Sequence, residues 1–150
     1  MGANYAIRGW MGSRLRKLRS EAGHSLESLA LELDTSATTV SAWEKGRSPR
    51  PRRFVLIAKF FNVPTWEFVN YPPGQATLSD LRGHAGLSQI EVCDHFERAG
   101  YPRQGVGPIE RGVKAPTEGQ RKILMELLHI DNEQLDQALR NTVRARAQHR

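Results

Sequence analysis

The sequence has 150 residues, with 22 Lys and Arg against 16 Asp and Glu, a net charge of +6, and one cysteine, Cys93. A single cysteine excludes an intrachain disulfide and a cysteine-based zinc site, and it fits a reducing cytoplasm. No apolar run approaches the roughly 18 residues that span a bilayer, and the amino terminus lacks the apolar segment of a secretion signal. We therefore expect a cytoplasmic protein with no membrane partner. The positive charge favours a polyanionic partner.

The charge is unevenly distributed. Residues 1–75 carry 11 basic and 6 acidic side chains, whereas residues 76–139 carry 7 basic and 10 acidic ones. Four arginines lie in the last eleven residues. The first half is therefore basic, and the second half is acidic with a basic tail.

The first half predicts five helices. A basic helix over 13–21 buries Leu15 and Leu18, and a helix, a tight turn and a second helix follow over 25–46, with Val40 and Trp43 facing the core. Ser36 is placed to cap the second of these helices through its hydroxyl. An amphipathic helix over 52–61 and a short final turn complete the set. The three tryptophans fall at or beside core positions, which favours packing over base stacking.

The segment between the halves predicts a linker over residues 71–76. Two prolines favour an extended path, and a glycine follows them. Fully extended, the seven residues from 70 to 76 would reach about 23 Å. We expect a short, semi-rigid connection.

The second half repeats the first. With Gly23 placed on Gly86, LRSEAGHSLESLALEL matches LRGHAGLSQIEVCDHF, and VSAWEKG later matches VGPIERG. The second copy has three extra residues in its turn. A repeat of this length predicts two domains, residues 1–70 and residues 77–150.

The second copy predicts helices over 77–84 and 89–98, and a third from Arg103 that Gly105, Gly107 and Pro108 should kink or shorten. Thr117 is placed to cap a fourth helix, and Asp131 begins a fifth. The last ten residues are polar and basic, and we expect them to be frayed.

These motifs resemble the helix-turn-helix family of phage repressors and Cro proteins, the xenobiotic-response-element type. The resemblance over residues 10–69 is carried by Arg19, Gly23, Ser25, Leu29-Ala30 and Glu44-Lys45-Gly46. It returns more weakly over 76–139 as Arg82, Gly86, Ser88-Gln89, Val92-Cys93 and Glu110-Arg111-Gly112. It implies an all-α fold of two tandem five-helix lambda-repressor-like domains.

The same resemblance implies roles for individual residues. Arg19 with Glu44, and Arg82 with Glu110, would be structural ion pairs that fix the recognition helix. In the first domain, phosphate contacts would come from Ser25, Arg47, Arg50 and Arg52, and base contacts from Ala37, Thr38, Thr39 and Ser41. In the second domain, the candidate DNA-binding residues are Ser88, Gln89, Arg103 and Gln104.

The two copies differ in their base-reading chemistry. The family often has Gln at the start of helix two, where it braces the first recognition-helix residue; the first copy has Leu26 there and the second has Gln89. Arg103 and Gln104 can form paired hydrogen bonds to guanine and adenine. We therefore hypothesise a division of labour on an asymmetric site, in which the basic domain holds phosphates. A protein-docking surface is the alternative for Arg103 and Gln104.

No catalytic site is indicated. The five histidines show no metal-ligand spacing, and no Ser-His-Asp order or carboxylate pair stands in a recognisable context. Cys93 is expected to be a small buried residue. We predict no enzyme activity, no metal and no cofactor.

The predicted function is sequence-specific binding of double-stranded DNA by a transcriptional repressor of the phage-immunity or mobile-element kind. Two joined modules would allow monomeric binding, and a weak homodimer is the other state considered. One alternative is an antitoxin-type autoregulator whose second domain binds a partner protein. Another is an activator that contacts RNA polymerase through its acidic second domain. The fold does not separate these functions.

Overall fold

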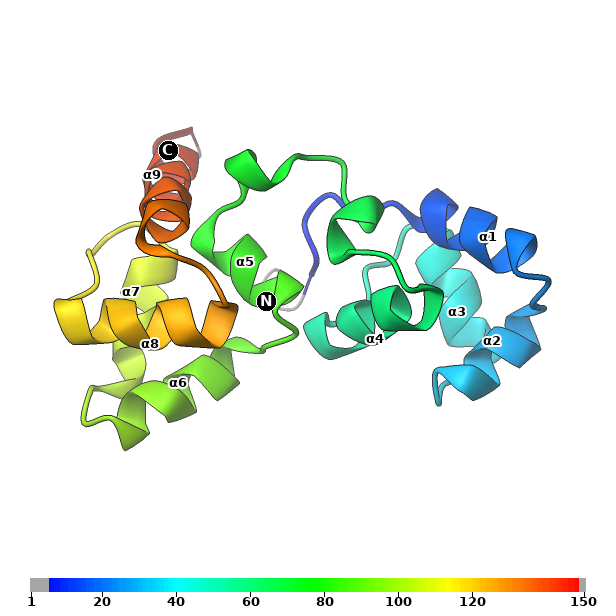
Figure 1. Ribbon diagram of the computed structural model, residues 1–150, viewed down its shortest axis with the longest axis horizontal. Coiled ribbons are helices and arrows are strands. Elements are labelled where there is room, and N and C mark those ends of the chain that lie inside the picture. Colours follow the sequence, from blue (N-terminus) through cyan, green and yellow to red (C-terminus); the bar gives the residue numbers. More distant parts are fainter. Residues whose placement is uncertain (1–5, 149–150) are drawn as a thin grey trace. The chain divides into compact units, whose positions relative to one another are not determined.

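A computed structural model describes residues 6–148 of the chain. Their secondary structure is helical, apart from one isolated antiparallel bridge between Trp10 and Val69 (Figure 1). The chain divides into two compact units, which we call unit 1 (up to Tyr71) and unit 2 (from Pro72).

Unit 1 contains four α-helices and a 3₁₀ helix. They are α1 (Gly12–Glu21), α2 (Leu26–Glu32), α3 (Ala37–Glu44), α4 (Pro51–Phe61) and η2 (Thr65–Phe68). The apolar positions of each helix meet in one core, whose fully buried side chains include Leu15, Leu29, Val40, Phe54 and Phe68. Trp43 is buried, and Trp10 stacks on Phe68. These two tryptophans therefore pack in or against the core.

The close approach of α1 to α3 depends on Gly12. A Cβ atom there would lie 2.2 Å from the carbonyl oxygen of Trp43 and 2.6 Å from that of Glu44. The indole nitrogen of Trp10 donates to the same Trp43 carbonyl at 2.9 Å. The carboxyl end of α3 is thus held by the residues at the start of α1.

Unit 2 contains two 3₁₀ turns and five α-helices. They are η3 (Pro73–Gln75), α5 (Leu78–His84), α6 (Gln89–Arg98), η4 (Arg103–Gly105), α7 (Val106–Glu110), α8 (Glu118–Leu128) and α9 (Asn132–Gln148). Its core joins buried side chains of α5, α6, α7, α8 and α9, with Phe96 and Leu135 fully enclosed. Cys93 is half-buried beside this core, and burial raises the pKa of its thiol.

The third helix of unit 2 is short. A 3₁₀ turn covers residues 103–105, and the α-helix that follows has five residues. We expected Pro108 to remove a hydrogen bond about six residues into a helix from Arg103. Because α7 begins at Val106, Pro108 instead lies in the first turn, where a backbone N–H would have no partner within the helix.

The predicted linker is folded in its second half, so the expectation of an extended path over residues 71–76 was wrong there. Residues 73–75 form η3, and Ala76 is buried. The side-chain amide of Asn141 donates to the carbonyls of Gly74 and Ala76 at 2.9 and 2.8 Å. This segment is therefore part of the fold of unit 2.

The prediction of a frayed tail over the last ten residues was wrong for residues 141–148, and residues 149–150 lie outside the described part of the chain. Helix α9 has 17 residues and continues to Gln148, and both Asn141 and Thr142 are buried. The hydroxyl of Thr142 accepts from the backbone N–H of Leu78 at 2.9 Å, and it donates to the carbonyl of Ala138 at 2.7 Å. The bond from Leu78 ties the tail to α5 and gives the first turn of that helix an acceptor for one of its N–H groups.

We predict that Asn141→Ala destabilises unit 2 by about 1–3 kcal/mol, because it leaves two carbonyls without their donor. Urea unfolding followed by far-UV circular dichroism measures the loss. Val143→Ala is the control, since this neighbour in α9 is 55% exposed and should change stability by less than about 0.5 kcal/mol. Equal effects of the two substitutions would show that the Asn141 hydrogen bonds do not hold the tail.

Candidate nucleic-acid interface

The outward face of α3 is the candidate reading surface. The Ser36 hydroxyl accepts from the N–H of Thr39 at 3.1 Å and so begins the helix as predicted. Val40 and Trp43 anchor one side of α3 in the core. The predicted base-contacting residues lie on the remaining surface: Thr38 is exposed, and Ala37, Thr39 and Ser41 are half-buried.

The four predicted base-contacting residues of α3 are not equivalent. The Thr39 hydroxyl lies 2.9 Å from the Ser36 hydroxyl and shares in the cap. Thr38 is the exposed residue of the four. A threonine there offers both a hydroxyl and a methyl group, which suits contact with a base edge or a thymine methyl.

An ion pair fixes the end of α3. The Arg19 Nε and Nη2 atoms donate to the two carboxylate oxygens of Glu44 at 2.5 and 3.1 Å, and Nη1 donates to the carbonyl of His24 at 2.9 Å. The hydrogen bond to Glu44 raises the pKa of Arg19. Because Arg19 lies on α1 and Glu44 is the last residue of α3, the pair sets where the reading helix ends.

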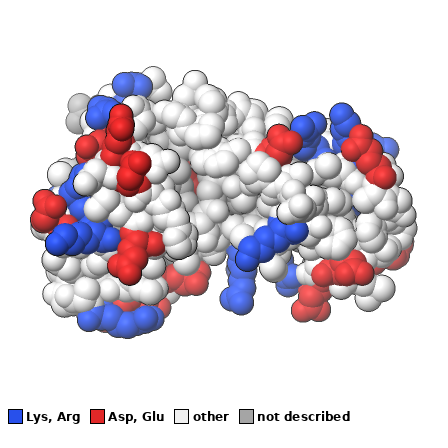
Figure 2. Space-filling view, viewed as in Figure 1, with Lys and Arg blue, Asp and Glu red and all other residues white. Residues whose placement is uncertain are grey.

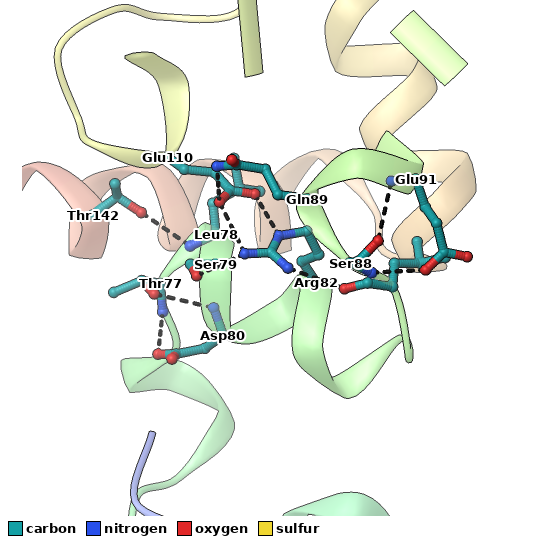
Figure 3. Close-up of polar contacts among 11 residues, drawn as sticks. Thr77, Leu78, Ser79, Asp80, Arg82, Ser88, Gln89, Glu91, Glu110 and Thr142 are labelled. Atoms are coloured by element: carbon teal, nitrogen blue, oxygen red, sulfur yellow. Dashed lines mark hydrogen bonds and ion pairs between the residues drawn. The ribbon is translucent and has the colours of Figure 1, made fainter. Parts of the chain in front are cut away.

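Unit 2 contains the same arrangement (Figure 3). The Arg82 Nε and Nη2 atoms donate to Glu110 at 2.7 and 3.1 Å, and Nη1 donates to the carbonyl of Leu87 at 3.0 Å. Both of the ion pairs expected from the sequence are thus present. In unit 2 the pair has an additional donor, the Gln89 amide, which lies 3.1 Å from Glu110.

The contact with Glu110 differs from the role that we expected for Gln89. We expected a glutamine at this position to brace the first residue of the recognition helix. The structure places its amide on the last residue of α7 instead. Gln89 therefore supports the Arg82–Glu110 pair rather than the start of the helix.

The predicted phosphate-binding positions of unit 1 surround α2 and the segment after α3. Ser25 is exposed at the amino terminus of α2, where its oxygen accepts from the N–H of Ser28 at 3.0 Å, and its hydroxyl proton can still be donated to a phosphate. Arg47, Arg50 and Arg52 are exposed. Arg53 differs from them, because its guanidinium donates to the carbonyl of Leu33 and so joins α4 to the end of α2.

The corresponding end of α6 is closed by an acid. Ser88 and Glu91 form a capping box in which each side chain binds the other's backbone N–H, at 2.9 and 3.2 Å (Figure 3). In unit 1 the residue three positions after the cap is Ser28; the first turn of α2 does contain an acid, Glu27, but that side chain is not part of the cap. The Glu91 carboxylate occupies the N–H of Ser88, so that donor is not available to a phosphate, and Ser88 is for this reason less suited than Ser25 to bind one.

Arg103 lies between two carboxylates. Its Nη1 atom is 2.5 Å from Asp94 and 3.2 Å from Glu97, both on α6. The hydrogen bond from Arg103 holds the pKa of Asp94 below its usual value. Gln104 is exposed. Of the two predicted base readers in unit 2, Arg103 would have to leave both acids before it could reach a base.

Sequence reasoning missed several contacts of the two units. The bond from Arg53 to Leu33 and the two carboxylates on Arg103 depend on packing between elements and have no short-range signal. The capping box of α6 does have such a signal, because Ser88 stands three residues before Glu91.

Among the described residues, no cluster of three His, Cys, Asp or Glu is arranged to hold a metal ion. Across that same part of the chain, no helix combines the length and apolarity needed to cross a membrane.

Comparison with known proteins assigns a family to unit 1. Residues 15–67 match the model of the family described as Helix-turn-helix. This segment is a Cro/C1-type helix-turn-helix domain, which supports sequence-specific binding of double-stranded DNA and a role in transcription regulation. No curated protein and no solved structure matches the chain.

We predict that Glu110→Gln destabilises unit 2 by about 3–5 kcal/mol, because it leaves the Arg82 guanidinium, only 3% exposed, without its counter-charge. Glu44→Gln should destabilise unit 1 less, since Arg19 is 15% exposed. All three tryptophans lie in unit 1, so tryptophan fluorescence follows its unfolding, whereas circular dichroism follows both units.

Glu67→Gln is the matched control. Its partner Arg14 lies 3.4 Å away, and both side chains are more than one third exposed, so the change should cost at most about 1 kcal/mol. A cost of Glu110→Gln no greater than that of Glu67→Gln would contradict a structural role for the buried pair.

Proposed function

We propose that the chain is a transcriptional repressor of the phage-immunity or mobile-element kind, which acts by occupying a promoter. The observation that carries this proposal is the surface of unit 1. A short polar face on α3 is fixed by a part-buried ion pair and has exposed arginines in the segment that follows it. This combination suits a helix that enters the major groove between two phosphate backbones.

In this proposal, unit 1 divides its contacts between bases and phosphates. Thr38 and its neighbours on α3 contact base edges, whereas Ser25, Arg47 and Arg52 contact phosphates. Phosphate contacts position the helix and produce salt dependence, and base contacts produce preference for a sequence. The two sets should therefore respond differently to substitution.

Unit 2 is proposed to be a divergent copy of the same module. The Arg82–Glu110 pair repeats the geometry of Arg19–Glu44, including the third hydrogen bond to a carbonyl five residues after the arginine. Helices α4 and α8 both have 11 residues, and both end at a residue in the left-handed conformation, Asn62 and His129. The repeat seen in the sequence supports the same conclusion.

A divergent second module supports an asymmetric site read by one chain. Gln104 is the residue best placed for this role, because its exposed amide can form two hydrogen bonds to an adenine. A covalent link between modules raises the local concentration of the second reader, so a monomer could bind a composite site.

A second candidate function is an antitoxin-type autoregulator in which unit 2 binds a partner protein. The acidic face of α6 favours it, since Glu91, Asp94 and Glu97 accompany Ile90, which is 58% exposed. Such a face disfavours phosphate and suits a basic protein surface with an apolar centre. An activator that contacts RNA polymerase through this face is a variant of the same idea.

Selection of binding sites from random duplex DNA with the full chain tests base reading by unit 1. We predict that Thr38→Ala alters the preferred sequence at one position, at a cost of about 1–3 kcal/mol, and leaves the salt dependence unchanged. Arg52→Ala should do the opposite, lowering the slope of log K against log salt by about 0.9.

Lys59→Ala is the control for Arg52, because Lys59 is also exposed on α4, two turns further from its amino terminus. Its slope should remain that of the unmodified chain. No preference for any duplex over random DNA at moderate salt would refute the proposed function.

The same selection tests unit 2. Gln104→Ala is predicted to remove preference for one base pair outside the element that unit 1 reads, whereas Arg103→Ala should leave the selected sequence unchanged, because Arg103 is held by Asp94 and Glu97. The protected region should extend over about two turns of DNA. Recovery of one short half-site by both the unmodified chain and the Gln104 variant would show that unit 2 does not read bases.

A further inference from the structure

Most of the cations of the described part of unit 2 that lie outside ion pairs gather at one place. Arg82 is paired with Glu110, Arg103 with Asp94 and Glu97, and Arg121 with Asp136. Other cations of the described part of unit 2 lie in no recorded ion pair. Five of these are exposed around the carboxyl end of α9, which we call the α9 basic end: Arg111, Lys114, Arg140, Arg144 and Arg146.

Two segments that are distant in sequence meet there. The segment after α7 lies against α9, since a Cβ on Gly112 would be 3.1 Å from the Thr142 carbonyl oxygen and 3.2 Å from the Val143 Cα. Arg111 precedes Gly112, and Lys114 follows two residues later. Arg146 is one helical turn after Thr142 and so lies on the side of α9 that this segment approaches.

Arg140 and Arg144 extend the charge onto the solvent-facing side of α9, again one turn apart. The acids of α9, Glu133 and Asp136, lie in its first half, and residues 137–148 contain none. Figure 2 shows Lys and Arg side chains at the carboxyl end of α9 and acidic side chains over its beginning. The α9 basic end is therefore a concentrated positive surface in a unit whose body is acidic.

Cations at the end of a helix also stabilise its dipole, and that accounts for part of their placement. It also accounts for Arg111, which caps the carboxyl end of α7, but not for Lys114, which lies beyond the end of that helix. Stabilisation of the dipole also does not require the end of α9 to be anchored to other segments, yet α9 is anchored. Thr142 is hydrogen-bonded to α5, Asn141 to η3, and Gly112 packs on the helix.

We propose that the α9 basic end binds the sugar-phosphate backbone of duplex DNA, adding a sequence-independent contact beside the site that unit 1 reads. This inference rests on the proposed function, because a duplex held by unit 1 presents phosphates to unit 2 at high local concentration. The start of α6 is itself poorly suited to phosphate, since the Glu91 carboxylate takes part in its cap. The α9 basic end supplies cations that are lacking at the start of α6.

The test compares two double substitutions that remove the same charge from unit 2. Arg144→Gln with Arg146→Gln removes two cations of the α9 basic end. Arg98→Gln with Lys122→Gln removes two exposed cations of α6 and α8 that lie outside it. Affinity of the full chain for a selected duplex and for a random duplex is measured by fluorescence anisotropy over a range of salt concentrations, after circular dichroism has verified folding.

Two lost phosphate contacts should lower the slope of log K against log salt by about 1.8. If the double variant and the unmodified chain have equal affinities when extrapolated to about 1 M salt, the variant should bind about 60-fold more weakly at about 0.1 M. The ratio of selected to random affinity should be unchanged. The Arg98/Lys122 control should keep the slope of the unmodified chain.

Equal slopes for the two double variants would overturn the inference, and binding of the α9 basic end to an acidic protein would give this result. A changed ratio of selected to random affinity would also overturn it, because the contact would then read sequence. Failure of the proposed function gives a different pattern. The unmodified chain would then bind selected and random duplexes alike, and the slope difference between the two double variants could still be measured.

Discussion

The structure of each unit depends on an arginine that is bonded to a carboxylate and to a backbone carbonyl; Arg82 is buried and Arg19 is part-buried. Arg19 and Arg82 each give two hydrogen bonds to a carboxylate and a third to a backbone carbonyl. Removing both charges from water is costly, and the pair is tolerated because almost every polar atom finds a partner. A guanidinium is planar and its donors are fixed in direction, so the pair sets orientation as well as distance. It thereby fixes the helix that unit 1 presents to its ligand.

Because the ion pair fixes the architecture from inside, the surface around it can change without loss of fold. Unit 1 has Ser28 where unit 2 has Glu91, and through this difference a carboxylate joins the cap of α6 but not that of α2. In unit 2 the arginine at the start of the third helix is neutralised by Asp94 and Glu97. The two units thus contain the same kind of ion pair while the surfaces beside it differ in charge, which is why function has to be argued from each surface separately.

Local signals in the sequence predicted most of the helices, and they did so for physical reasons. Caps such as Ser36 and Thr117 act within three residues, and the apolar periodicity of each helix is set by its own turn, so both are visible in a short window. The errors occurred where distant segments meet. Asn141 binds carbonyls more than sixty residues earlier, which folds the linker and the tail together. The partners of Arg103 likewise depend on how η4 packs on α6, whereas the closed cap of α6 could have been read from the Ser88 to Glu91 spacing.

The length of α9 is related to a hydrogen bond that each unit makes between the start of its first helix and its last helix. In unit 1 the tie is between backbones, since the N–H of Met11 donates to the carbonyl of Phe68 at 2.8 Å, and the 3₁₀ helix η2 is long enough to supply it. In unit 2 a side chain makes the tie, because the hydroxyl of Thr142 accepts from the N–H of Leu78. That hydroxyl stands in the eleventh residue of a helix that begins at Asn132, so the last helix must be extended to deliver it. A contact that stabilises α5 therefore also carries Arg144 and Arg146 out to the surface beside the segment after α7, and in this way a requirement of folding positions the charge from which phosphate binding is inferred.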